Sequence, residues 1–243
     1  MLKGRGYCDL NLDLSRKCVC NTVMNSQNTA LTPPSRLALV YAKDQSRVFL
    51  ELLLTHDVRL AGIISNIKEP LIGQMRMAWW RDVISKPAAQ RPKGEPLLAQ
   101  LTALGETAIG GKTQAAMLQL VDAWDVLLTD AIWTPDVLQS HARSKAEAIF
   151  AGFADVMDVD PCATSMLQAG EYWALAGLLR HCQTAQQYDA VTAALAAQPA
   201  RCSLRRELRP LAILAFAARQ EQAAGQGNLR QGLRLIFNAL TGR

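Results

Sequence analysis

Few side chains in this sequence have types and spacings that could do chemistry. Asp122 and Asp125 are three residues apart, so on a helix their carboxylates share a face and could hold a divalent cation. No basic or glycine-rich segment that could bind a phosphate adjoins them. Because such pairs are common on solvated helix faces, we interpret this one as a surface feature.

The histidines and cysteines do not indicate a metal centre. His56, His141 and His181 lack the spacing of a metalloprotease helix. The six cysteines show neither Cys-x-x-Cys nor Cys/His zinc spacing. His181 and Cys182 are neighbours, and neighbouring side chains on a helix do not face each other, so they form no nucleophile–base pair. Reduced thiols in a reducing compartment are the simplest interpretation.

One predicted helix concentrates arginine and tryptophan at Arg76, Trp79, Trp80 and Arg81. Adjacent helical positions point about 100° apart, so one tryptophan can face the core while the other meets an edge or a pocket. Arg76 and Trp80 share a face, which permits a cation–π contact or a cavity lining. A packed core helix with a charged outer face is the alternative.

Composition limits the classes of protein and partner. The chain has 243 residues, of which 50% are hydrophobic and 19% charged, and its net charge is +5. It can bury a substantial core, and it shows no basic stripe with interleaved aromatic residues, so we expect no nucleic-acid partner. Charged residues interrupt the apolar positions near the start, and we expect a cytoplasmic protein, with a peripheral contact to the inner membrane left open.

The pattern of apolar residues is helical after an initial tail. We expect residues 1–33 to be a disordered tail and residues 34–243 to form one helical domain, with Ser35 as the first N-cap. Gly110-Gly111 is one of the Pro or Gly sites expected to separate helices. The predicted helices are Arg36–Ile64, Pro70–Ser85, Pro96–Glu106, Thr113–Asp130, Pro135–Met157, Pro161–Gln183, Ala185–Ala197, Leu204–Gln222 and Leu229–Leu240. No sustained period-2 run occurs, so the class is all-α.

The last of these segments is amphipathic. Leu229, Leu233 and Ile236 fall on one face of the predicted helix, and Arg230 and Arg234 fall on another. A basic amphipathic helix can lie on an anionic bilayer, and it can equally close a helical bundle. We favour the bundle.

Several segments resemble the squalene/phytoene synthase family. RLALVYAKDQSRVFLELLLTHDVRLAGI (Arg36–Ile63) is similar to the first helix pair of that family, and EPLIGQMRMAWWRDVI to the helix that follows. HARSKAEAIFAGFADVM and AGEYWALAGLLRH resemble the helix before the second Asp-rich motif and the helix that carries it. The resemblance covers about Arg36–Arg243 and is sharpest over Pro70–Asp82. It implies an isoprenoid-synthase-like helical bundle around a central apolar cavity.

The same resemblance implies that the metal ligands are missing. Family members ionise an allylic diphosphate, and two Asp-rich motifs hold the Mg²⁺ that neutralises the leaving group. In this chain those aspartates fall on Ala61, Gly62, Ser65, His181 and Ala185. None of these residues offers a carboxylate to magnesium, which prefers hard oxygen ligands. We therefore expect no catalytic residue and no cofactor, with Mg²⁺ retained only if the chain is an active enzyme.

A few residues could still bind a ligand. Asp57 lies one helical turn before Ala61 and could hold one ion, but a single carboxylate does not replace two motifs. The candidates for binding a prenyl diphosphate or another isoprenoid or lipid are Asp57, Arg59, Arg76, Trp80 and Arg180.

The carboxylate-poor pattern is also similar to a branch of the family that contains mitochondrial complex I assembly factors. The resemblance thus implies a catalytically impaired protein that binds a lipid or isoprenoid, or that assists assembly of a respiratory complex by contacting one of its subunits. The alternative is an active prenyltransferase that condenses prenyl diphosphates in squalene-, phytoene- or hopanoid-type biosynthesis.

Overall fold

The computed structural model describes residues 31–66, 69–129, 132–160, 163–199 and 203–224, and every element in these ranges is helical. This confirms the all-α class. The α-helices are α2 (Pro33–Tyr41), α3 (Asp44–Asn66), α4 (Pro70–Ser85), α5 (Pro96–Ala103), α6 (Ala108–Thr129), α7 (Pro135–Ala146), α8 (Gly152–Val156), α9 (Thr164–Leu178), α10 (Ala185–Ala196) and α11 (Arg209–Ala224). A π-helical turn, Glu147–Ala151, joins α7 to α8, and short 3₁₀ turns cover Ala88–Gln90, Leu179–His181 (η3) and Arg206–Leu208.

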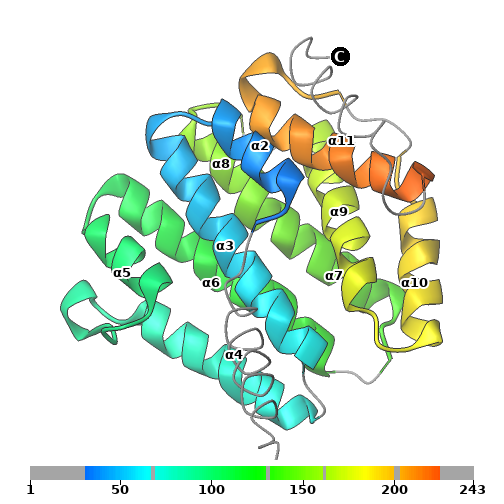
Figure 1. Cartoon of the computed structure of the whole chain (residues 1–243), viewed down its shortest axis with the longest axis horizontal. Helices are drawn as coiled ribbons and strands as arrows, with labels where there is room; N and C mark the ends of the chain where they lie inside the picture. Colours follow the sequence, from blue (N-terminus) through cyan, green and yellow to red (C-terminus); the bar gives the residue numbers. More distant parts are fainter. Residues whose placement is uncertain (1–30, 67–68, 130–131, 161–162, 200–202, 225–243) are drawn as a thin grey trace, which may run out of the picture. The chain divides into compact units, whose positions relative to one another are not determined.

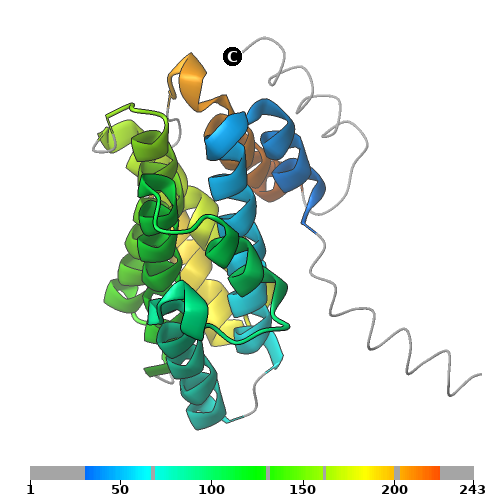
Figure 2. The ribbon, with the colours of Figure 1, turned by 90° about the vertical axis from the view of Figure 1, so that its left-hand side faces the viewer.

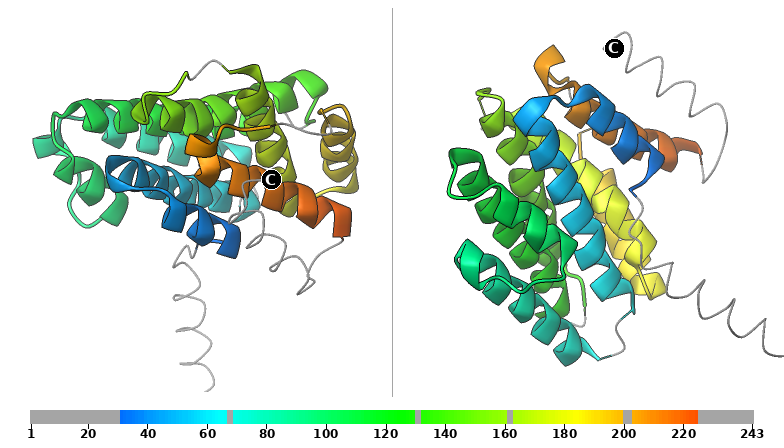
Figure 3. Two further views of the ribbon diagram at one scale, coloured as in Figure 1. Left: turned by 90° about the horizontal axis from the view of Figure 1, so that it is seen from above. Right: turned by 60° about the vertical axis from the view of Figure 1, so that its left-hand side comes forward.

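Four helices form the centre of this bundle. α3 packs on α6, α6 on α7, and α7 on α9 (Figure 1). α2 and α11 lie together on the side of the bundle away from α6 and α7, as the view from above in Figure 3 shows. α4 packs along the outer side of α6 and reaches beyond the central helices at one end (Figure 2). Among the described elements, α4 packs mainly on α6 with a smaller contact to α3, whereas α7 packs on α6, α9 and α10.

The contacts between these helices are mainly apolar. The largest fully buried side chains include Trp124, Phe49, Phe150 and Phe153. Among the described residues, no helix combines the length and hydropathy needed to cross a membrane.

The first described helix begins earlier than the sequence suggested. Thr32 is the N-cap of α2, and its hydroxyl oxygen accepts a hydrogen bond from the backbone N–H of Ser35 at 3.4 Å. The prediction of Ser35 as N-cap was therefore wrong. Pro33 and Pro34 occupy the first turn, where the missing N–H of proline has no helical acceptor to lose.

The predicted helix Arg36–Ile64 is interrupted. α2 ends at Tyr41, Ala42 is extended, and α3 starts at Asp44, whose φ is +46°. The Ser46 hydroxyl donates to the carbonyl oxygen of Lys43 at 2.7 Å and accepts from the Lys43 N–H at 3.3 Å. A short polar side chain thus closes a turn with the backbone instead of continuing the helix.

Gly110-Gly111 does not separate helices, because both residues lie in the first turns of α6. The Thr107 hydroxyl accepts a hydrogen bond from the Gly110 N–H at 3.1 Å, and a Cβ on Gly110 would come 2.4 Å from the carbonyl oxygen of Gly105. The glycine is therefore required by the tight entry into α6. The predicted tail and the predicted helix Leu229–Leu240 lie outside the described residues, except for the last part of the tail, where Pro33 already belongs to α2.

Candidate functional site

A buried cation at the centre of the bundle is the most unusual feature of the molecule. The Nζ of Lys145, a residue of α7 that is 3% exposed, lies 2.9 Å from Oδ1 of Asp57 on α3. It also lies 4.5 Å from the ring centroid of Trp124 on α6 and 4.7 Å from that of Trp173 on α9. We call Asp57, Trp124, Lys145 and Trp173 the lysine cage; its members come from all four central helices.

The sequence brings these helices together through small residues. A Cβ on Gly170 would lie 2.8 Å from the Cβ of Ala146, so the glycine is needed for the close approach of α9 to α7. Ala146 follows Lys145 directly, and Trp173 lies about one helical turn after Gly170. This close approach therefore sets the indole of Trp173 against the ammonium group.

Within the lysine cage, the positive charge of Lys145 and the negative charge of Asp57 offset each other. The indole N–H of Trp124 donates to the same Asp57 oxygen at 2.8 Å, so Oδ1 receives two donors. Burial lowers the pKa of Lys145, and the Asp57 carboxylate beside it acts in the opposite direction. An ion pair of this kind tolerates its low-dielectric surroundings only while both partners and their hydrogen bonds are present.

His141 lies against the cage as a neutral ring. It is fully buried, and its Nδ1–H donates to the carbonyl oxygen of Ala123 at 2.7 Å. Burial, together with the charge of Lys145, lowers the pKa of His141 to about 3. The ring packs edge-on against Trp124 with centroids 4.8 Å apart. His141 thus fills space beside the cage without adding a second charge.

Two helix ends meet at the edge of the cage. Ser65, in the last turn of α3, and His181, in η3 after α9, are joined by a hydrogen bond of 2.6 Å between the serine Oγ and the histidine Nδ1. Burial and the charge of Lys145 lower the pKa of His181 to about 4, so this ring is neutral near pH 7. The side-chain amide of Gln183 also donates to the carbonyl oxygen of Ile64 at 2.8 Å. The two segments are therefore held together by neutral groups.

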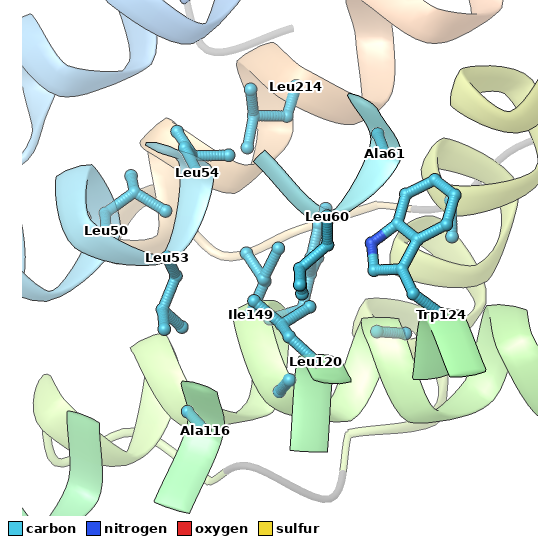
Figure 4. Close-up of a cluster of buried hydrophobic side chains, with 14 of the residues drawn as sticks. Leu50, Leu53, Leu54, Leu60, Ala61, Ala116, Leu120, Trp124, Ile149 and Leu214 are labelled. Atoms are coloured by element: carbon cyan, nitrogen blue, oxygen red, sulfur yellow. The ribbon is translucent and has the colours of Figure 1, made fainter. Parts of the chain in front are cut away.

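The other positions at these helix ends provide no metal ligand. Ala61 is buried in the hydrophobic cluster that also contains Trp124 (Figure 4). A Cβ on Gly62 would point into open space, and Ala185 is exposed at the start of α10. Within the described residues, no group of three His, Cys, Asp or Glu side chains could hold a metal ion. The residues here do not fit the oxygen-rich shell that Mg²⁺ prefers.

The predicted binding residues do not form one site. Asp57 belongs to the lysine cage, whereas Arg59 points toward α5 and pairs with Glu95 at 3.4 Å. Trp80 is buried against His56, with ring centroids 5.0 Å apart. The expectation that Trp79 and Trp80 would face differently is confirmed, because Trp79 is 45% exposed and Trp80 only 4%.

The remaining two arginines lie on different surfaces. Arg180 pairs with Glu221 of α11 at 3.0 Å. This pair lies at the rim of a small recess between α2, α9 and α11 that Trp173 also lines. Arg76 is exposed on α4, where no described residue forms an ion pair or hydrogen bond with it. The shared face of Arg76 and Trp80 permitted a cation–π contact or a cavity lining. Among the described residues no such contact joins them: Arg76 is exposed, whereas Trp80 is buried.

Asp122 and Asp125 form the surface feature that their spacing indicated. Arg81 of α4 donates to an oxygen of Asp122 at 2.6 Å and to one of Asp125 at 3.2 Å. The hydrogen bonds to both carboxylates raise the pKa of Arg81. The aspartates thus fasten α4 to α6 through an arginine.

Comparison of the chain with protein-family models, with curated proteins and with solved structures found no match. The lysine cage holds a cation between two aromatic faces and a carboxylate, and the protein supplies that cation. Its ammonium group is fixed between these partners and nearly inaccessible, so the cage as it stands stabilises the fold.

Proposed function

We propose that this chain is a catalytically silent protein of the squalene/phytoene synthase type, which binds an isoprenoid or lipid or assists the assembly of a respiratory complex. One observation supports the proposed lack of catalytic activity more than any other. Ser65 and His181, which stand where the resemblance expects one aspartate of each motif, hydrogen bond to each other at 2.6 Å. Each side chain satisfies the other, and neither offers an anionic oxygen to a metal.

One oxygen of Asp57, the carboxylate one helical turn before Ala61, already has two partners. Oδ1 of Asp57 accepts from Trp124 and is paired with Lys145. Recruiting Asp57 to a magnesium ion would bring a second cation to a buried site that already contains one, and like charges at short range in a low dielectric repel strongly. The environment of Asp57 therefore favours a structural role over metal binding.

The meeting of these two helix ends also supports the resemblance. In a magnesium-dependent prenyl transfer the two motifs must share metal ions, so their helices must face each other. Here α3 and the end of α9 do so across Ser65 and His181, and Gln183 adds a further hydrogen bond to α3. The isoprenoid-synthase-like bundle and its central apolar cavity remain part of this proposal, as does the choice between a lipid ligand and a respiratory-complex subunit.

Native co-purification tests the binding role. The tagged full-length protein would be isolated without detergent, and extracts of the purified fraction would be analysed by mass spectrometry for prenyl lipids and for respiratory-complex subunits. We expect at least one of these classes to be enriched over a fraction prepared in parallel from a Gly170→Leu variant, in which the contact between α7 and α9 is broken. If neither class is enriched, the binding and assembly role is wrong.

A further inference from the structure

We draw no further inference here: the strongest candidate, the exposed apolar face of α4 that Leu71, Ile72, Met75 and Trp79 form, carries none, because nothing in the described part of the structure shows what covers it.

Discussion

The molecule places tryptophan near a cation in two regions that differ in what else surrounds the cation. In the lysine cage, Lys145 is 3% exposed and has a carboxylate and two indole faces as partners. On α4, Arg76 is exposed beside Trp79, and no described residue neutralises it. The ammonium group of Lys145 therefore interacts within the fold, whereas the guanidinium group of Arg76 can still bind a group outside the described residues.

This difference shows why residue type alone does not identify a site. Both regions combine aromatic and basic residues, which in isolation indicate cation–π binding. Only the geometry separates a cation that is already bound within the protein from one that can still bind.

The largest expected effect follows from breaking the buried pair. Asp57→Ala leaves Lys145 buried without a partner and should lower the free energy of unfolding by about 3–5 kcal/mol. Urea denaturation of the single variants and of Asp57→Leu/Lys145→Met measures this effect, and the double variant should recover most of the loss. A loss under about 1 kcal/mol in Asp57→Ala would mean that the cage is not the structural centre of the bundle.

A smaller effect is expected from pH. His56 is fully buried, no described group bonds to its ring nitrogens, and burial lowers its pKa from 6.5 to about 3. Below pH 6.5 the His56 imidazole binds a proton in the unfolded chain, whereas in the folded chain it does so only near pH 3. The free energy of unfolding therefore falls as the pH drops through this range. Between pH 7.5 and 5 the loss from this residue should be about 2 kcal/mol.

His56→Leu isolates this contribution, because the substitution removes the titrating group and keeps an apolar side chain against Trp80. The free energy of unfolding of the variant, measured at both pH values, should change less than that of the unchanged protein by about this amount. His141 and His181, whose pKa values are about 3 and about 4, should contribute to the pH dependence that remains. If the pH dependence of His56→Leu equals that of the unchanged protein, then folding does not lower the pKa of His56.

The smallest effect is expected at the surface ion pairs of α4. Arg81 is 42% exposed, and Asp122 is 62% exposed. Solvent screens such a pair, so Arg81→Gln should cost less than about 1 kcal/mol of unfolding free energy, measured by the same urea titration. A loss comparable to that of Asp57→Ala would mean that the Asp122–Asp125 face has a larger role than fastening α4 to α6.

The helical class and most helix positions could be predicted from the spacing of apolar residues and from Pro and Gly. The break between α2 and α3 could not, because it depends on the local hydrogen bonds of Ser46 with Lys43 rather than on hydrophobicity. The pattern predicts that Gly110-Gly111 separates two helices, whereas in the structure close backbone packing at the start of α6 explains Gly110.

The lysine cage was missed for a physical reason. Asp57, Trp124 and Trp173 are far apart in sequence and meet only through helix packing. One local signal existed: Lys145 lies between Ala142 and Ala146 on the buried side of α7, four residues after His141. A lysine at an apolar position of a helix points to a buried partner, although it does not identify that partner.

The central claim is that the helix ends around Ser65 and His181 support no prenyl transfer. The most direct measurement is diphosphate release when the purified protein is incubated with farnesyl and geranylgeranyl diphosphate and Mg²⁺. We predict no release above a protein-free control, and no difference between the unchanged protein and Asp57→Asn. Release that depends on Mg²⁺ and is abolished by Asp57→Asn would contradict the account and identify the chain as an active prenyltransferase.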